Sequence, residues 1–153
     1  MIEGVSVTPL TQISDNRGRV MHMLSTRSTN FLSFGEVYFS CTNPGVVKAW
    51  YQHKKMTMNY AVVFGELKVV LYDDRPNSVS QGQIDEICIS PEKYFLVTVP
   101  PRIWYGFKTT SKETSILANC TSIPHDPLEI VRISPTDASI PYSWEINPSQ
   151  ENE

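Results

Sequence analysis

The chain has few cysteines for its 153 residues: three in all, Cys41, Cys88 and Cys120. They are far apart, odd in number and without the C-x-x-C spacing of a redox or metal site. A disulfide framework is therefore excluded, and reduced thiols buried in the core are the simplest interpretation. We expect a cytoplasmic protein.

Basic residues and long apolar runs are also scarce. The net charge is −3, the pI is about 5.6, and the densest basic cluster is the pair Lys54–Lys55. Such a charge does not favour nucleic acid or an anionic membrane. No apolar stretch approaches the ~20 residues of a transmembrane helix, and residues 1–10 lack the basic start and apolar run of a signal peptide. We expect neither nucleic acid nor membrane as a partner.

A clear helical period is missing too, whereas short runs rich in Val, Ile, Phe, Tyr and Thr recur between turn residues. They predict strands near Arg19–Leu24, Glu36–Cys41, Val46–His53, Asn59–Phe64, Glu66–Tyr72, Gln83–Ile89, Tyr94–Val99, Trp104–Lys108 and Thr114–Cys120. Leu128–Ile133 is ambiguous, and Gly65 marks a tight reversal, for which a plain hairpin is the simplest reading. The pattern predicts an all-β fold with little helix. We expect one domain, 1–153, with a loose tail at about 145–153.

One stretch combines glycines with a set of side chains at a recognisable spacing. Between Gly45 and Gly65 lie Tyr51, His53 and Met58. The spacing resembles the first motif of the cupins, G-x5-H-x-H-x4-E-x6-G, in which the histidines and the glutamate bind a metal. Only His53 keeps its ligand place, because tyrosine and methionine stand at the other two.

A second segment resembles the second cupin motif, P-x-G-x2-H-x3-N. It begins at Pro100, with Arg102 at the place of the glycine, Tyr105 at that of the histidine and Thr109 at that of the asparagine. A first-row metal needs about three or four N, O or S ligands. With one histidine left, we expect no metal, and we expect no other cofactor.

Alternation of side chains places Tyr51 and His53 on one face of their strand. Val47 and Ala49 continue that face, which we expect to line the barrel. Lys48 falls on the opposite face unless a bulge or a rim position intervenes. A hydrogen-bonded core histidine is the bland alternative for His53, and the motif spacing favours a functional one.

Further stretches, in order along the chain, resemble the dTDP-4-dehydrorhamnose 3,5-epimerase family, whose members are metal-free cupins. Asp15–Gly18 resembles its D-x-R-G, Val47–Gln52 its V-R-G-L-H-Y, Gly65–Ser78 its G-x-v-x-D-v-a-v-D-x-R-x-x-S and Val99–Phe107 its i-P-p-g-f-a-H-G-F, and Ile140–Trp144 lies where the family ends in I-x-W-P. The matches are weak singly and specific in combination. They cover nearly the whole chain and imply an antiparallel β jelly roll, the cupin barrel.

The resemblance implies chemistry on a nucleotide-linked 4-keto-6-deoxy sugar. Family members invert carbons beside the ketone: a base removes a proton, an enolate forms, and an acid returns a proton on the other face. In the family the base is a histidine backed by an aspartate, the acid is a tyrosine, and a lysine assists. These places fall, in that order, on Tyr51, Ser134, Ala118 and Met58, so the usual catalytic residues are largely replaced.

The nucleotide-sugar 3,4-ketoisomerases provide a second resemblance. Their R-G-x-H-A-H-K is similar to Lys48–Lys54, where His53 matches the second histidine. His53 is thus the remaining member of a pair that moves protons in a related pocket. We expect His53 to be the base, and Tyr51 or Tyr105 to be the acid or to support the enolate.

Four more residues are expected to bind the substrate. Lys48 stands where the family keeps an arginine for the diphosphate, and Arg17 is a candidate for the nucleotide end, reached across a homodimer. Trp104 and Tyr60 are expected to stack on a base or sugar in the cavity. Ordinary solvated charge is the alternative for the two cations, and core packing for the two aromatic residues.

The combined prediction is a homodimeric nucleotide-sugar isomerase or epimerase. It would act by enolisation next to the ketone of a nucleotide-linked 4-keto-6-deoxy hexose, in deoxysugar and surface polysaccharide biosynthesis. Two alternatives remain open. One is a catalytically inactive cupin that binds a nucleotide sugar or another small molecule, and the other is a structural jelly-roll module without a ligand.

Overall fold

The computed structural model describes residues 1–144, and the predicted loose tail at about 145–153 lies outside the described residues. Within residues 1–144 all regular secondary structure is β-strand. No helix of that part of the chain is long and apolar enough to cross a membrane. The single-domain prediction includes the tail and stays a prediction.

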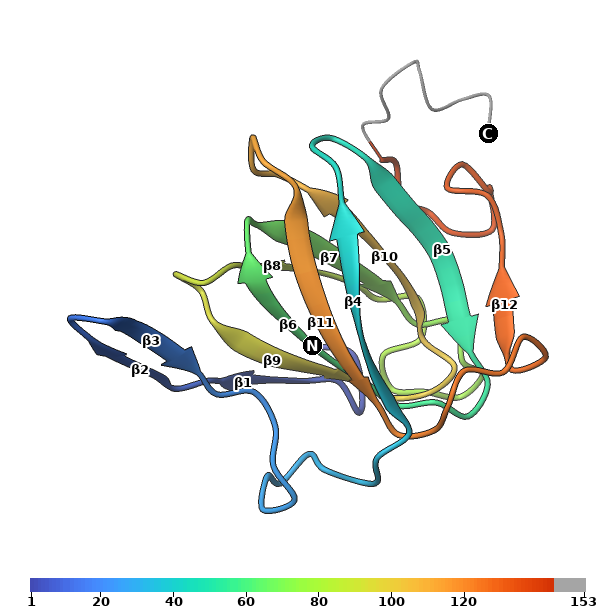
Figure 1. The fold of residues 1–153 in the computed structure, drawn as a ribbon. Helices are drawn as coiled ribbons and strands as arrows, with labels where there is room; N and C mark the ends of the chain where they lie inside the picture. The colour runs from blue at the N-terminus through green and yellow to red at the C-terminus, as the bar shows by residue number, and fades with distance from the viewer. Residues whose placement is uncertain (145–153) are drawn as a thin grey trace.

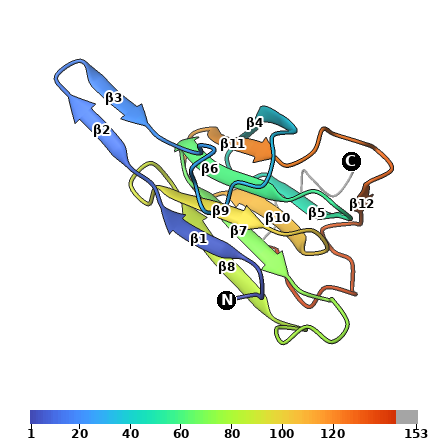
Figure 2. The ribbon, with the colours of Figure 1, turned by 90° about the horizontal axis from the view of Figure 1, so that it is seen from below.

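Two five-stranded sheets form a sandwich, and a two-stranded hairpin projects from it (Figures 1 and 2). The first sheet has the order β1 (Ser6–Pro9), β9 (Phe95–Val99), β6 (Met58–Phe64), β11 (Ser115–Thr121) and β4 (Glu36–Thr42). The second has the order β12 (Ile130–Arg132), β5 (Val47–His53), β10 (Trp104–Thr109), β7 (Leu67–Tyr72) and β8 (Ile84–Ile89). The hairpin pairs β2 (Gln12–Asp15) with β3 (Gly18–Met21). All pairs are antiparallel, which confirms the predicted jelly roll.

The main hydrophobic core lies between the two sheets. The central strands β6 and β7 are buried on both faces, and this explains apolar runs such as Ala61–Val62 and Val69–Leu71. The edge strand β4 has one face toward solvent, so Val37 and Phe39 are exposed whereas Tyr38 faces the interior. Burial on one or both faces therefore sets the sequence pattern of each strand.

A second apolar cluster covers the outer face of the second sheet. Trp50 and Trp104 from that sheet pack against Ile140 and Trp144 of the C-terminal segment. The backbones of Trp50 and Ile133 exchange two hydrogen bonds of 3.1 Å. The segment after β12 is thereby held against β5, the strand that carries His53.

A bulge interrupts the pairing of β5 with β10. Tyr51 pairs with Tyr105 and Lys48 pairs with Phe107. Two residues thus separate the paired positions on β5, whereas only Gly106 separates them on β10. The extra residue reverses the alternation of side chains along the first half of β5.

This bulge corrects the predicted faces of β5. Val47 and Ala49 lie in the outer cluster and do not line the barrel, whereas Lys48 faces the interior with Tyr51. Strict alternation predicted the reverse, because it cannot register an extra residue. Gly106 fits opposite the bulge because a Cβ there would lie 2.5 Å from the Ala49 Cβ.

The reversal at Gly65 has the predicted positive φ, 71°, but it is not a plain hairpin. Strand β6 belongs to the first sheet and β7 to the second, so the turn carries the chain from one sheet to the other. A Cβ on Gly65 would lie 2.5 Å from Ser115 Oγ and 2.9 Å from Ser115 Cα. Glycine is therefore required by conformation and by space.

Two further expectations need correction. Strands β1 and β2 were not predicted, because each has only four residues. The ambiguous segment at Leu128–Ile133 contains β12. Cys41 and Cys88 are exposed rather than buried. They point outward from β4 and β8, the edge strands of the two sheets.

Candidate active site

A cavity of about 530 Å³ opens between the two sheets beside β4 and β5. One wall comes from β5, β10 and β12 of the second sheet, and the other comes from β4, β6 and β11 of the first. The structure brings five of the predicted site residues together in its lining: Lys48, Tyr51, His53, Tyr60 and Tyr105. The bulge in β5 is what allows Lys48 to join the others.

His53 lies at the end of β5 and uses both ring nitrogens. Its Nδ1 is 2.6 Å from Glu129 Oε2, and its Nε2 is 3.0 Å from the Tyr105 hydroxyl. All three side chains are buried. His53 is therefore fixed in orientation by a carboxylate on one side and a phenol on the other.

Glu129 reaches His53 from the turn before β12 and was not predicted from the sequence. Burial by itself would raise the pKa of Glu129, but hydrogen bonds from the amides of Lys55 and Met56 and from His53 bring that pKa below its usual value. The carboxylate is thus ionised and accepts the Nδ1 proton of His53. By inference the lone pair of the imidazole lies on Nε2.

The sequence held one signal for this carboxylate. Glu129 is an acidic residue between the apolar Leu128 and Ile130 in the segment Leu128–Ile133. The family's aspartate place falls instead on Ser134, which is exposed and pairs with Thr136. A buried glutamate in an apolar strand context is a candidate site residue in its own right.

Tyr105 stands at the centre of the aromatic wall. Its ring stacks on that of His53 at 5.7 Å and is tilted against those of Tyr51 and Tyr60 at 5.5 and 5.9 Å. Burial, with a smaller contribution from Tyr38, raises the pKa of Tyr105 far above its usual value. Tyr105 is therefore a neutral phenol that donates its proton to Nε2 of His53.

Two cations line the mouth of the cavity. Lys48 Nζ donates to Ser40 Oγ at 3.1 Å and to the Cys41 carbonyl at 2.9 Å, which links the two sheets. The guanidinium of Arg132 lies over the Tyr51 ring, 5.8 Å from its centroid. Arg132 was missed because its strand was ambiguous in sequence. Both cations can meet an anionic group that enters here.

Trp104 and Arg17 do not join this cavity. Trp104 points to the outer cluster, and its Nε1 donates to Asp74 Oδ2 at 2.8 Å; alternation along β10 puts it opposite Tyr105. Arg17 lies at the turn of the projecting hairpin, 85% exposed and paired with Asp15 at 2.5 Å. The prediction that Trp104 stacks on a ligand in the cavity is therefore wrong. In this conformation Arg17 does not line the cavity of its own chain.

The family's other catalytic places, Ala118 and Met58, are not part of the cavity lining either. Ala118 pairs with Phe39, whose side chain is on the outer face of the sheet. Met58 is fully buried, and its sulfur accepts a hydrogen bond from Tyr60 at 2.6 Å. In residues 1–144 no group of three or more His, Cys, Asp or Glu side chains is placed to hold a metal ion.

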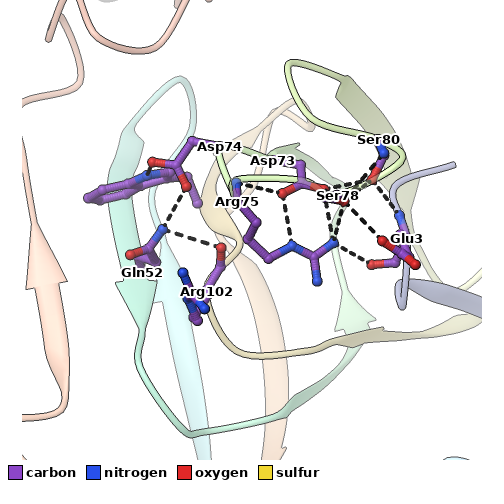
Figure 3. A network of polar contacts seen from close by, with 9 residues as sticks. Glu3, Gln52, Asp73, Asp74, Arg75, Ser78, Ser80 and Arg102 are labelled. Carbon is purple, nitrogen blue, oxygen red and sulfur yellow. Dashed lines mark hydrogen bonds and ion pairs between the residues drawn. The ribbon is translucent and has the colours of Figure 1, made fainter.

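The family-like motif at 73–78 forms a polar network outside the cavity lining (Figure 3). Asp73 is completely buried and accepts hydrogen bonds from Arg75 Nε at 2.8 Å and from the hydroxyls of Ser78 and Ser80 at 2.7 and 2.6 Å. Arg75 also donates to the Glu3 carbonyl at 2.7 Å. This motif therefore joins the N-terminal segment to the loop after β7.

The jelly roll is the fold of a class of protein, the cupin-type sugar epimerases, to which the structural neighbours belong. The match to one family is direct. The family model of dTDP-4-dehydrorhamnose 3,5-epimerase covers residues 1–153, and the chain belongs to this family. The resemblance inferred from the sequence motifs is confirmed.

Three relatives show how the family match extends. The chain is 33% identical to the probable low-salt glycan biosynthesis epimerase Agl13 of Haloferax volcanii over 143 residues, 92% of this chain and 88% of the relative. It is 27% identical to the spore coat polysaccharide biosynthesis protein SpsL of Bacillus subtilis over 146 residues, 94% and 97% of the two chains. A solved structure of a dTDP sugar isomerase from Desulfovibrio desulfuricans is 43% identical, with a TM-score of 0.89 and 94% and 92% coverage. Family and relatives together indicate a dTDP-sugar epimerase or isomerase in glycan or polysaccharide biosynthesis.

Proposed function

We propose that this protein acts on a dTDP-linked 4-keto-6-deoxy hexose and that His53 removes a proton from a carbon beside the ketone. The observation that carries the proposal is the buried pair of His53 and Glu129 in the cavity wall, with 2.6 Å between Nδ1 and Oε2. A ketone acidifies the neighbouring C–H bond, and a positioned imidazole is the side chain suited to take such a proton near neutral pH.

The hydrogen bond between His53 and Tyr105 gives the second step. In the resting site the Tyr105 O–H points at Nε2. As the substrate C–H takes its place at Nε2, the Tyr105 hydroxyl leaves that nitrogen and donates instead to the ketone oxygen, where the enolate charge develops. Glu129 meanwhile stabilises the imidazolium. In this proposal Tyr105 supports the enolate.

Substrate binding follows from the charges and rings around the dyad. Lys48 and Arg132 line the mouth of the cavity and are proposed to bind the diphosphate. The rings of Tyr51 and Tyr60 line the interior and are proposed to contact the sugar. In this proposal Tyr51 is a binding residue rather than the acid, since it lies on the same strand as the base His53.

Deuterium exchange tests the role of His53. A dTDP-4-keto-6-deoxy hexose is incubated with protein in deuterated water and followed by proton NMR. The parent protein should introduce deuterium beside the ketone, and His53→Asn should lower this rate by ~10²–10⁴. His22→Asn is the matched control, because His22 is exposed just after β3 and does not line the cavity. If His53→Asn exchanges like the parent, the base lies elsewhere; if the parent binds without exchange, the inactive binder is correct.

We also propose a homodimer in which the hairpin meets a second copy. Ile13 and Val20 pair on one face of the hairpin and are 63% and 61% exposed. An apolar pair on a projecting hairpin fits burial against a partner, and it would carry Arg17 to a neighbouring cavity. Light scattering of the parent should give twice the 17.4 kDa chain mass. Ile13→Asp should shift the measured mass toward that of a single chain. A parent that is monomeric at micromolar concentration would contradict this. The cytoplasmic location stays a prediction.

A further inference from the structure

A phenol on the wall that faces His53 is not used by the chemistry above. Tyr38 lies on β4 in the first sheet, whereas His53 lies on β5 in the second, and both line the same cavity. Tyr38 is 40% exposed and is part of the cavity lining. It pairs in register with Asn119 on β11.

Asn119 sets the direction of the hydrogen bond at Tyr38. Asn119 is completely buried, and its Oδ1 accepts the backbone N–H of Asn59 at 3.2 Å. Its Nδ2 must therefore point the other way, and it donates to the Tyr38 hydroxyl at 2.8 Å. Since the Tyr38 oxygen accepts this bond, its own proton is left to donate. In the described residues Tyr38 makes no hydrogen bond as a donor.

The other cavity phenols are already committed. The Tyr60 hydroxyl donates to the sulfur of Met58, and the Tyr105 hydroxyl faces Nε2 of His53. Tyr51 belongs to the same strand as His53, on the same wall. Tyr38 is the cavity phenol that combines a free proton with a position on the opposite sheet.

We propose that Tyr38 is the acid of the reaction and that it protonates the enolate on the face opposite His53, so that the carbon is inverted. The inference rests on the proposed role of His53. His53 Nε2 takes the proton, and the C–H electron pair forms the enolate. The enolate carbon then takes the Tyr38 proton, and its electron pair forms the new C–H bond. The imidazolium and the phenolate left behind return to neutral by proton exchange with water at the cavity mouth.

The surroundings of Tyr38 suit a donor. Burial raises the pKa of Tyr38, and the charge of Glu36 raises it further, so the phenol is neutral and holds its proton at pH 7. The N–H of Asn119 opposes this effect and stabilises the phenolate once the proton has left. The two-wall arrangement predicts inversion, whereas a base and an acid on one wall would return the proton to the face from which it was taken.

The test separates proton removal from inversion. With the dTDP-4-keto-6-deoxy hexose in deuterated water, two rates are measured: deuterium entry into recovered substrate and formation of the inverted product. Tyr38→Phe should lower inversion by ~10²–10⁴ and leave deuterium entry within a few-fold of the parent. Tyr94→Phe is the matched control, because the Tyr94 hydroxyl is buried without a hydrogen bond partner and Tyr94 is not in the cavity lining.

The outcomes are distinguishable. If Tyr38→Phe inverts at the parental rate, or if it is folded and loses both rates, Tyr38 is not the acid on the second face, and the role of His53 stands on its own variant. A parent product whose ketone has moved without inversion would also overturn the inference. Absence of exchange in the parent would instead contradict the proposed function and this inference together.

Discussion

Glu129 determines what His53 can do. A neutral imidazole has two tautomers, and the base needs the one with its lone pair toward the cavity. An ionised carboxylate 2.6 Å from Nδ1 selects it by accepting the Nδ1 proton. The same carboxylate accepts the amides of Lys55 and Met56 at 2.7 and 2.8 Å, so its position is fixed by the backbone.

Replacing the carboxylate with an amide should reverse the tautomer. In Glu129→Gln the oxygen can keep the two backbone amides, and the NH₂ group would face Nδ1 of His53 and donate to it. Nε2 would then carry the proton and lose its basicity, so we expect the deuterium exchange rate to fall by ~10²–10⁴ with the fold retained. Proton NMR measures the exchange rate, and circular dichroism checks that the fold is retained. A parental exchange rate would show that the pair is only structural.

Arg102 is the second informative single residue. It stands at the glycine place of the second cupin motif and has a φ of 66°, a region that costs most side chains ~1–2 kcal/mol. Its carbonyl and amide still pair with Gln52 and His53, at 3.3 and 2.7 Å. A glycine at this position would adopt the same conformation without strain.

Arg102→Gly should therefore stabilise the protein, by about 0.5–1 kcal/mol after the greater freedom of glycine in the unfolded chain is subtracted. Asn77→Gly is the control. Asn77 has a φ of 65°, but asparagine tolerates this region, so its replacement by glycine should stabilise the protein less. Urea unfolding gives the free energy of unfolding of the parent and of both variants. Equal gains at the two positions would argue against strain at Arg102.

Among the elements, the turn between β6 and β7 shows how space and conformation add. Gly65 and Gly82 have φ values of 71° and 86°. A Cβ on Gly65 would meet Ser115 at 2.5 Å, whereas a Cβ on Gly82 would have no atom within 4 Å. The two positions share the backbone requirement and differ only in room.

Alanine at the two positions separates the contributions. Gly82→Ala should cost ~1–2 kcal/mol for the left-handed conformation alone. Gly65→Ala should cost that amount and a further ~1–3 kcal/mol, because Ser115 Cα is backbone and cannot rotate away. The midpoints of urea unfolding give the difference. Similar losses at both would show that the sheets can separate slightly at this turn.

At the scale of the whole molecule, two buried carboxylates tie stability to pH. Burial opposes the charge of Asp73, but its hydrogen bonds from Arg75, Ser80 and Ser78 outweigh this and lower its pKa far below the usual value. The pKa of Glu129 is lowered as well. A group with a lowered folded-state pKa stabilises the fold above its unfolded pKa and loses that contribution as pH falls through the folded one. Both contributions are thus complete at pH 7 and decline below about pH 4.

Asp73→Asn should cost about 3 kcal/mol at pH 7, because it leaves the Arg75 charge without its partner. The difference between parent and variant should narrow from about pH 4 downward, because Asp73 of the unfolded parent chain takes up a proton there while folded Asp73 is still ionised. Urea unfolding at pH 7 and pH 3 provides the measurement. A difference that stays constant over this range would show that Asp73 is not ionised in the folded protein.

The strand pattern and the motif frame were readable from the sequence because both depend on local rules. Alternation and turn residues predicted an all-β fold, and the family resemblance implied the jelly roll. The spacing from Gly45 to Gly65 identified His53 and Tyr51, since a strand of fixed period places its residues without help from the rest of the fold. Tyr105 came from the second motif in the same way. The family was recognisable because such landmarks occur in order over the whole chain.

The partners of these residues were decided by tertiary structure. A bulge opposite Gly106 turned Lys48 inward and Val47 outward, and one extra residue in a ladder leaves no periodic trace. Glu129 lies 76 residues from His53, and Asn119 lies 81 from Tyr38, so no local pattern could join either pair. Such contacts form because the sheets face each other and a buried polar group must find its partner wherever the chain returns.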